Sequence, residues 1–248
     1  MSERTIAVIP ARYASSRFPG KPLALIAGKS MVQRCYESTS QCPDLAEVVV
    51  ATDDERIFQH VQSFGGRVVM TSPSHPTGTD RIAEAVRGLD ADLIVNVQGD
   101  EPLMSADVLS RLIAAMRSSG ADMGTAAVPF SALDGIDPAN PNNVKVVVDN
   151  RGFALYFSRA LIPFPREGGS PLSPMLHWGL YAYRREFLAQ FVTWPQGRLE
   201  ACEKLEQLRA LENGARIMVI TANERSVGVD TPEDLKVVED ILRARDGK

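Results

Sequence analysis

The sequence predicts an α/β protein with a mostly parallel central sheet and an inserted β-rich region. Short apolar strands alternate with amphipathic helices along most of the 248 residues. The run Leu93–Val97 is apolar except for Asn96, as expected of a strand that is buried on both faces of a parallel sheet. The alternation lapses at residues 129–183, where strands follow one another. We therefore expect an α/β core at residues 1–128 and 184–248, interrupted by this inserted region.

Local signals place the elements. Thr231-Pro232-Glu233-Asp234 is the clearest helix start, with an N-cap Thr, a Pro in the first turn and two acids behind it. Asp53 and Asp54 suit the positive end of a helix dipole, so we expect both to cap the helix that follows them. The expected strands are Thr5–Pro10, Glu47–Thr52, Arg67–Thr71, Leu93–Val97, Gly124–Val128, Val144–Val148, Phe153–Phe157 and Arg216–Thr221; the expected helices are Met31–Ser40, Asp53–Phe64, Asp80–Gly88, Ala106–Gly120, Arg185–Phe191, Leu199–Glu212 and one from Thr231, with a loop at Pro163–Pro174.

The composition narrows the class of protein. A hydrophobic content of 44% with 23% charged residues is typical of a soluble globular protein. The net charge of −4 argues against a general nucleic-acid binder, which needs surplus basic charge. The three cysteines show no Cys-x-x-Cys spacing, which favours reduced thiols in the cytoplasm over disulfides or a zinc site. Neither a membrane-length apolar run nor a signal-peptide pattern occurs, so we expect no membrane partner.

A basic loop follows the first strand. Between Ala11 and Pro22 it holds Arg12, Arg17 and Lys21 and no acidic residue, although the protein as a whole is acidic. Like charges this close repel each other, and a polyanion would compensate them. A phosphate charge about 4 Å from one cation gains on the order of 4 kcal/mol at an effective dielectric constant of about 20. The loop therefore predicts a triphosphate site, with a solvated basic loop as the alternative.

Carboxylates stand at the ends of two segments. Asp100 follows the buried central strand, at the sheet edge where α/β proteins bind ligands. Gly99 is expected to let the backbone approach such a ligand closely. Asp230 ends the segment that precedes the last helix. An ordinary capping role for Asp100 remains the alternative.

A Pro/Ser/Thr-rich loop, Ser72–Thr79, follows the third strand. Such a loop at a strand's carboxyl end can read a nucleotide base through main-chain groups, or it can be a plain connection. Arg81 lies in the first turn of the next helix, where the helix dipole disfavours a cation. This placement suggests a carboxylate or phosphate of a ligand nearby.

Four motifs in the same order identify a family. They are Ile9-Pro10-Ala11-Arg12-Tyr13, Arg17-Phe18-Pro19-Gly20-Lys21-Pro22-Leu23, Asn96-Val97-Gln98-Gly99-Asp100-Glu101-Pro102 and Val229-Asp230-Thr231-Pro232-Glu233-Asp234-Leu235. With these motifs the chain closely resembles the 3-deoxy-manno-octulosonate (Kdo) cytidylyltransferases, from about Ile6 to Leu242. The resemblance implies a Rossmann-like core of the nucleotide-diphospho-sugar transferase type.

The resemblance also implies an activity and a site. CMP would pass from CTP to Kdo with release of pyrophosphate, for lipopolysaccharide synthesis, with Mg²⁺ as cofactor. Arg12, Arg17 and Lys21 would hold the triphosphate, and Asp100 and Asp230 would bind Mg²⁺; of these, Asp100, Lys21, Arg12 and Asp230 would be the catalytic residues. The family further suggests a homodimer formed through the inserted region. The implied sugar contacts are Arg81, Gln98, His177, Tyr181 and Glu206.

Other interpretations stay open at this point. His177 could be an ordinary core histidine, Tyr181 a packing aromatic and Glu206 a helix-surface acid. The acid sugar could instead be a sialic acid or 8-amino-Kdo. A non-catalytic nucleotide-sugar sensor would keep the basic loop without needing two metal-binding carboxylates.

Overall fold

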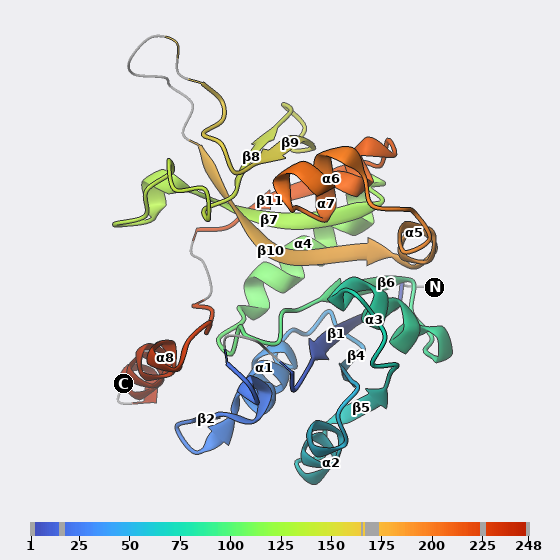
Figure 1. Ribbon diagram of the computed structural model, residues 1–248, viewed down its shortest axis with the longest axis vertical. Coiled ribbons are helices and arrows are strands. Elements are labelled where there is room, and N and C mark those ends of the chain that lie inside the picture. Colours follow the sequence, from blue (N-terminus) through green and yellow to red (C-terminus); the bar gives the residue numbers. More distant parts are fainter. Residues whose placement is uncertain (1–2, 15–17, 165, 167–173, 224–226, 247–248) are drawn as a thin grey trace. The chain divides into compact units, whose positions relative to one another are not determined.

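The computed structural model describes residues 3–14, 18–164, 166, 174–223 and 227–246 (Figure 1). The chain forms two compact units. Unit 1 contains Met1–Ser110 and Ser226–Lys248, and unit 2 contains Arg111–Arg225. The boundary falls within helix α4 (Ala106–Ser119). Unit 2 contains the whole of the predicted inserted region 129–183, whose role in substrate binding and dimerisation stays a prediction.

Unit 1 is built on parallel strands in the order β6-β1-β4-β5 (Figure 1). Strand β1 (Thr5–Ala11) lies between β4 (Glu47–Thr52) and β6 (Leu93–Asn96), and β5 (Arg67–Met70) pairs with β4. All four residues of β6 are buried, as the apolar run predicts. The carboxyl ends of these parallel strands therefore meet at one edge, where the loops that carry Arg12, Asp53, Ser72 and Asp100 begin.

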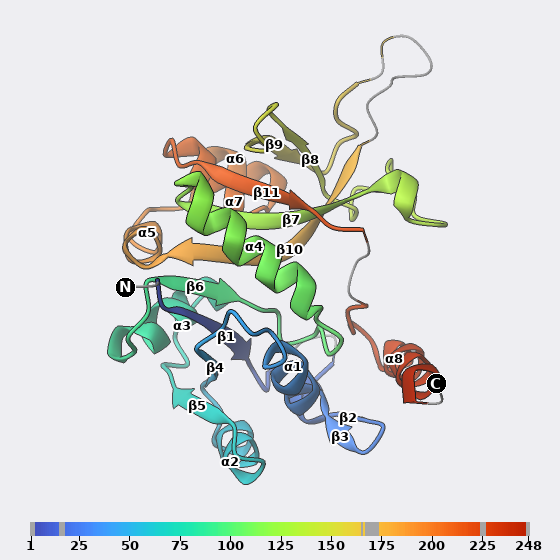
Figure 2. The ribbon, with the colours of Figure 1, turned by 180° about the vertical axis from the view of Figure 1, so that it is seen from behind.

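Three helices of unit 1 begin at side-chain caps, of which the sequence analysis predicts only Asp54. Ser30, Asp54 and Thr77 each accept a hydrogen bond from a main-chain N–H of the first turn that they cap. Helix α3 covers the sheet face seen in Figure 1, and α1 covers the face seen in Figure 2. The helices are α1 (Met31–Thr39), α2 (Glu55–Ser63), α3 (Gly78–Ala85) and α8 (Pro232–Asp246), with 3₁₀ turns η1 (Lys21–Leu23) and η2 (Val86–Gly88) and the hairpin β2 (Leu25–Ile26) and β3 (Lys29–Ser30).

Unit 2 is built on a second set of strands around β7 (Met123–Pro129). The long strand β10 (Met175–Arg184) pairs with it antiparallel, and β11 (Ile217–Thr221) pairs with it parallel. The hairpin of β8 (Lys145–Val148) and β9 (Ala154–Ser158) joins β10. Helix α4 lies over the strands on the side seen in Figure 2, and α6 and α7 lie on the side seen in Figure 1. The short helices are η3 (Phe130–Ala132), α5 (Arg185–Phe191), α6 (Arg198–Glu203) and α7 (Gln207–Glu212).

The structure confirms the α/β class with a mostly parallel sheet and corrects individual elements. The single helix predicted at Leu199–Glu212 is wrong: α6 and α7 are separate, because Lys204 adopts a left-handed conformation with φ of 54° that ends α6. Strand β10 has no counterpart among the expected strands. The loop Pro163–Pro174 lies largely outside the described residues. Within the described part of the chain, no helix has both the length and the apolar character needed to cross a bilayer.

Candidate active site

Lys21 joins three parts of unit 1 that are far apart in sequence. Gly20 precedes it with φ of 74°, and the N–H of Gly20 donates to the carbonyl of Tyr13 at 3.0 Å, which closes the basic loop. The Lys21 ammonium donates to Asp100 Oδ2 and to the main-chain carbonyl of Val229, each at 2.9 Å. The basic loop, the end of β6 and the segment before α8 therefore meet at one ammonium group.

The turn after β6 is held against the end of β1. A Cβ atom on Gly99 would lie 2.7 Å from the main-chain oxygen of Pro10, so only glycine fits there. The close neighbour at Gly99 is the protein's own backbone, and the approach of a ligand there stays a prediction. The carbonyl of Asp100 accepts a hydrogen bond from the N–H of Val229 at 2.9 Å, which fixes the carboxylate's segment on its other side.

Asp230 directly follows Val229 at the start of α8. The N–H groups of Asp230 and Thr231 both donate to Asp234 Oδ2, at 2.9 and 2.8 Å. These two hydrogen bonds lower the pKa of Asp234 and confirm the predicted helix start. Asp230 itself is exposed. The second predicted metal-binding carboxylate, that of Asp230, therefore directly follows Val229, the residue that is hydrogen-bonded to both Asp100 and Lys21.

These two carboxylates are the residues that could hold a metal ion. In the described ranges, no group of three or more His, Cys, Asp or Glu side chains is arranged to hold one. Mg²⁺ commonly takes only one or two protein carboxylates and completes its shell with water and substrate phosphates. Two aspartates on adjacent, hydrogen-bonded segments fit that requirement.

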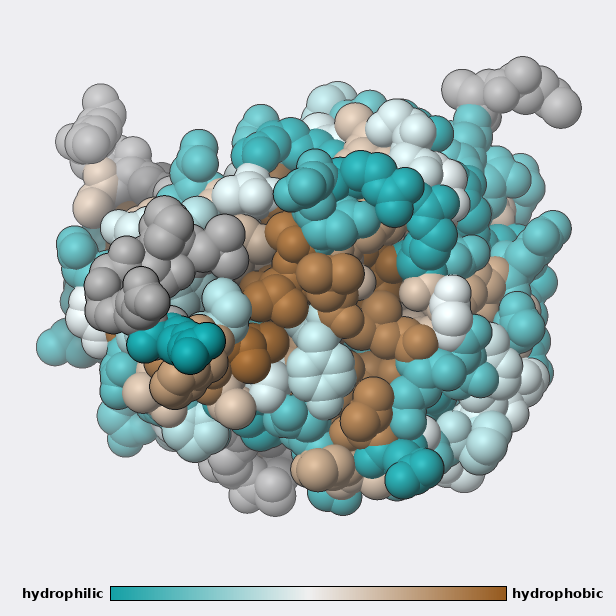
Figure 3. All heavy atoms as spheres, turned by 90° about the horizontal axis from the view of Figure 1, so that it is seen from above, coloured by the Kyte–Doolittle hydropathy of each residue, from teal (hydrophilic) through white to brown (hydrophobic). Residues whose placement is uncertain are grey.

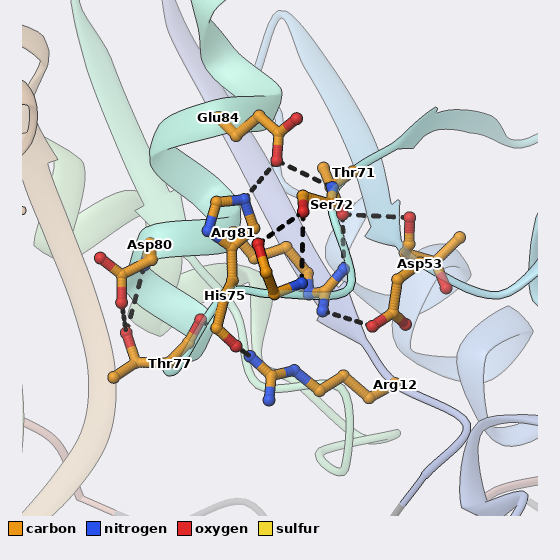
Figure 4. Close-up of polar contacts among 11 residues, drawn as sticks. Arg12, Asp53, Thr71, Ser72, His75, Thr77, Asp80, Arg81 and Glu84 are labelled. Atoms are coloured by element: carbon orange, nitrogen blue, oxygen red, sulfur yellow. Dashed lines mark hydrogen bonds and ion pairs between the residues drawn. The ribbon is translucent and has the colours of Figure 1, made fainter.

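Arg12 fastens the loop between β5 and α3. Its Nη2 donates to the main-chain carbonyls of His75 at 2.6 Å and Thr77 at 3.1 Å (Figure 4). The structure thus gives this predicted triphosphate ligand a second task, because it ties the end of β1 to the loop Ser72–Thr79. Arg17, the third predicted cation, lies outside the described residues.

Arg81 is fully buried and has its counter-charge inside the protein. Its guanidinium donates to Asp53 Oδ2 at 2.7 Å and to the hydroxyl of Thr71 (Figure 4). The expectation that both Asp53 and Asp54 cap α2 is therefore wrong for Asp53. Asp54 alone is the cap, with its carboxylate accepting from the N–H of Arg56 at 3.0 Å. The cation that the helix dipole disfavours is compensated without a ligand, and a contact of Arg81 with the sugar stays a prediction.

His177 and Tyr181 form a polar aromatic pair on β10. A register shift between Trp178 and Tyr181 interrupts the strand's regular alternation, and the two rings lie 5.5 Å apart. His177 Nε2 and the hydroxyl of Thr125 are 3.1 Å apart. Burial lowers the pKa of His177 to about 3, so its ring is neutral near pH 7. Burial, and then the negative charge of Glu206, raise the pKa of Tyr181 well above its usual value.

Beside this pair lies Gln207, which the sequence analysis does not single out. The hydroxyl of Tyr181 donates to Gln207 Oε1 at 3.2 Å. Gln207 is 3% exposed, and its Nε2 has no hydrogen-bond partner among the described residues. A buried amide donor without a partner is costly, which points to a group that it binds in the working protein. Its position next to Glu206 was the only available sequence signal.

Comparison with known proteins identifies the family. The cytidylyltransferase family profile matches residues 6–217. A 3-deoxy-manno-octulosonate cytidylyltransferase of Syntrophotalea carbinolica is 55% identical over 246 residues, covering 96% of this chain and 98% of the relative. One of Geobacter sulfurreducens is 51% identical over 248 residues, with the same coverage of 96% and 98%. This chain belongs to the 3-deoxy-manno-octulosonate cytidylyltransferase family.

A solved structure agrees with the fold of this cytidylyltransferase along its length. This chain is 42% identical in sequence to the CMP:2-keto-3-deoxy-manno-octonic acid synthetase whose structure was solved in complex with CTP. The two structures superimpose with a TM-score of 0.91, and the alignment covers 98% of this chain and 99% of that one. The enzyme is accordingly a nucleotidyltransferase.

The predicted site residues of this cytidylyltransferase fall into separate groups. Lys21 and Asp100 are in direct contact, and Asp230 adjoins their partner Val229. Arg12 contacts the loop before α3. Gln98 begins the turn that leads to Asp100, with its carbonyl accepting from the N–H of Glu101 at 3.2 Å. His177, Tyr181 and Glu206 belong to unit 2.

Proposed function

We propose that this chain transfers CMP from CTP to Kdo and releases pyrophosphate. The observation that carries the proposal is the contact of Lys21 with Asp100 and with the carbonyl before Asp230. It brings a cation and two carboxylate-bearing segments together, which supports a site for a nucleotide triphosphate and its counter-ion. The relatives with 55% and 51% identity carry this activity in their names.

The reaction is a displacement at the α-phosphorus of CTP. The anomeric hydroxyl oxygen of Kdo forms the new bond to phosphorus, the bond from phosphorus to the oxygen that bridges to the β-phosphate breaks, and the hydroxyl proton passes to solvent. Arg12 and Lys21 neutralise phosphate charge and hold the triphosphate in place. Positioning and charge neutralisation account for this catalysis without a covalent enzyme intermediate.

We infer that Mg²⁺ is the cofactor and that Asp100 and Asp230 hold it. Their hydrogen-bonded segments and their oxygen donors support this assignment. When bound, Mg²⁺ supplies charge neutralisation on the phosphates and lowers the pKa of a coordinated hydroxyl. Lys21 then serves to keep Asp100 in place before substrate arrives, since its ammonium donates to Oδ2.

The sugar site is proposed to include neutral polar groups. His177 and Tyr181 are both uncharged near pH 7, because burial shifts their pKa values away from neutrality. They can therefore hydrogen-bond sugar hydroxyls without competing for the proton of the reaction. The unpartnered amide of Gln207 supports the same site. The other proposed sugar contacts are Arg81, Gln98 and Glu206.

We also propose a homodimer formed through the inserted region, in the cytoplasm. Figure 3 shows apolar side chains gathered across one face of the molecule. Leu155 on β9 is 62% exposed and Phe164 is 82% exposed, both within the inserted region. Exposed apolar surface of this kind favours an interface with a second copy. Cys35, Cys42 and Cys202 are free thiols, which agrees with a reducing compartment.

A pyrophosphate-release assay with CTP, Mg²⁺ and a set of acid sugars tests the proposal. Kdo is expected to give the highest kcat/KM, and omission of Mg²⁺ is expected to abolish release. Faster turnover of a sialic acid or of 8-amino-Kdo would reassign the sugar. Absence of release with every sugar, despite CTP binding, would identify a nucleotide sensor instead.

A further inference from the structure

One oxygen of Glu84 holds the loop before α3 in two places. Glu84 Oε2 accepts a hydrogen bond from the N–H of Ser72 at 2.9 Å and contacts the ring Nε2 of His75 (Figure 4). These contacts, that of His75 first, lower the pKa of Glu84. Because Glu84 lies on α3, a rigid helix fixes the loop that leads into it.

His75 is held at both of its ends. Its ring is bound to Glu84, and its main-chain carbonyl accepts from Arg12 Nη2 at 2.6 Å. The ends of the loop are also fixed, because Thr71 donates from its N–H and its hydroxyl to the carbonyl of Thr52, and Thr77 caps α3. The path of the backbone between Thr71 and Thr77 therefore depends on Glu84. Glu84 holds the middle of this loop through the ring of His75, whereas Arg12 holds it through the carbonyl of His75.

This loop lies where a nucleotide base is expected in an α/β protein. It follows a parallel strand at the carboxyl edge of the unit 1 sheet, where α/β proteins bind ligands. The loop also accepts a hydrogen bond from Arg12, a proposed triphosphate ligand. Its end lies close to the end of β1, because a Cβ atom on Gly78 would be 3.5 Å from the ring of Pro10. A base attached to a triphosphate held by Arg12 would thus lie within reach of the loop.

The loop offers main-chain acceptors that can tell cytosine from uracil. Ser74 and Pro76 are exposed, and their carbonyls accept no hydrogen bond from any described residue. Cytosine presents an amino donor at its N4 position, whereas a uracil-type base presents an acceptor oxygen at that position. A fixed carbonyl facing that position binds cytosine and repels uracil, but only while the backbone is held in place.

We propose that Glu84 is a positioning residue for nucleotide selection: through His75 and Ser72 it fixes the loop whose carbonyls distinguish CTP from UTP. This inference rests on the proposed function for the identity of the nucleotide. Glu84 acts through the loop and does not itself touch the substrate.

The test compares Glu84→Ala, Glu84→Gln and wild type in pyrophosphate release, with CTP and UTP each varied at saturating Kdo and Mg²⁺. Loss of both hydrogen bonds in Glu84→Ala is expected to raise the KM for CTP about tenfold and to lower the CTP-over-UTP ratio of kcat/KM by a similar factor, with kcat within about twofold of wild type. In Glu84→Gln the amide oxygen can still accept both hydrogen bonds, so a KM within about threefold of wild type is expected.

Glu37→Ala is the matched control. The Glu37 side chain is 39% exposed against 31% for Glu84, and it also accepts from two donors, Lys29 and Gln33, away from the loop. Its KM for CTP and its nucleotide ratio are expected to equal those of wild type.

Several outcomes would overturn the inference. A Glu84→Ala protein that melts at a lower temperature but keeps the wild-type KM and nucleotide ratio has lost only stability. A Glu84→Gln protein as defective as Glu84→Ala shows that hydrogen-bond acceptance is not what matters. If Glu84→Ala does not fold, His75→Asn, which removes the ring and keeps the carbonyl bound to Arg12, is expected to show the same loss of selectivity, and unchanged selectivity contradicts the proposal.

The proposed function and the inference fail in different ways. Titration calorimetry with CTP and with UTP, in the absence of sugar, measures base selection without turnover. A wild-type protein that binds CTP more tightly than UTP but releases no pyrophosphate contradicts the proposed activity. The inference is then tested by calorimetry alone, which compares the CTP and UTP affinities of Glu84→Ala with those of wild type. Wild-type turnover with unaltered selectivity in Glu84→Ala contradicts the inference alone.

Discussion

Lys21 and Asp100 form an ion pair of 2.9 Å across 79 positions of the sequence. The Lys21 side chain is 16% exposed and that of Asp100 is 36% exposed, so the pair faces solvent on the carboxylate side. The same ammonium also binds the carbonyl of Val229. A single lysine thus orders both a proposed metal ligand and the segment that carries the other one.

Replacing Lys21 by Ala is expected to weaken CTP binding by about 10- to 100-fold, because a charged donor to the phosphates is lost together with its hold on Asp100. Titration calorimetry with CTP measures this, and pyrophosphate release gives the matching kcat/KM. Lys29→Ala, which breaks the surface pair of Lys29 and Glu37 at 2.7 Å, is the control and is expected to bind CTP normally. Equal affinities for the two variants would contradict the assignment of Lys21.

Asp100→Asn is expected to lower kcat by at least about 100-fold while the melting temperature stays within a few degrees, because a charge is lost and the shape is kept. Steady-state pyrophosphate release and differential scanning calorimetry measure the two quantities. Asp92→Asn is the control at the other end of β6, where the Asp92 carboxylate accepts a hydrogen bond from the N–H of Arg4 at 2.7 Å. Near-normal turnover in Asp100→Asn would refute its metal role.

Gly99→Ala is expected to cost about 1–3 kcal/mol of unfolding free energy and most of the activity, because the new Cβ forces apart the backbones of residue 99 and Pro10. The cause is the distance of 2.7 Å between that Cβ and the Pro10 oxygen. Urea unfolding and turnover are the measurements. Gly88→Ala, where the Cβ meets nothing within 4 Å, is expected to leave both unchanged. A stable and active Gly99→Ala enzyme would show that the turn has room to move.

Asp53→Ala is expected to cost about 3–5 kcal/mol, because it leaves the buried guanidinium of Arg81 without its counter-charge. Asp54→Ala, one residue later, removes a helix cap and the surface ion pair of Asp54 with Arg56, and is expected to cost about 1 kcal/mol. Urea unfolding followed by circular dichroism compares the two variants. A larger loss for Asp54→Ala would mean that capping, and not the pair with Arg81 at 2.7 Å, is the main contribution of this dipeptide.

His177→Asn is expected to make the protein less sensitive to acid. The pKa of His177 is about 3 in the folded protein and about 6.5 in an unfolded chain, so between these values only the unfolded state binds the proton. Stability therefore falls as the pH drops below about 6.5, by at most about 1.4 kcal/mol per pH unit from this residue. Urea unfolding from pH 8 to pH 5 is expected to show a shallower decline for His177→Asn than for wild type, and parallel declines would contradict the neutral buried ring.

Features encoded by neighbouring residues could be predicted from the sequence. The start of α8 follows from the contacts of Asp234 with Asp230 and Thr231, which are three or four positions away. The apolar composition of β6 predicts a strand that is buried on both faces, and all four of its residues are buried. Asp100 could be placed at the sheet edge because a strand ends there.

Other features depend on contacts that local sequence does not encode. Local sequence predicts a capping role for Asp53, because nothing nearby in the sequence indicates its partner Arg81, which lies 28 positions away. The break between α6 and α7 was missed because Lys204, with no glycine to mark it, adopts a left-handed conformation. Gln207 was missed because a buried amide without a partner is a property of the fold and not of residue type.

The hydrogen bond between Lys21 and Val229 spans 208 positions, so it cannot form until residue 229 has been translated. At about 5–20 residues per second, the ribosome needs roughly 10 to 40 s to progress from one residue to the other. During that interval the early strands of unit 1 can pair, although the Val229 carbonyl that accepts a hydrogen bond from Lys21 has not yet been synthesised. A nascent chain that stops short of Val229 therefore has Lys21 without this hydrogen bond, so the ordering of the Lys21 ammonium comes late in synthesis.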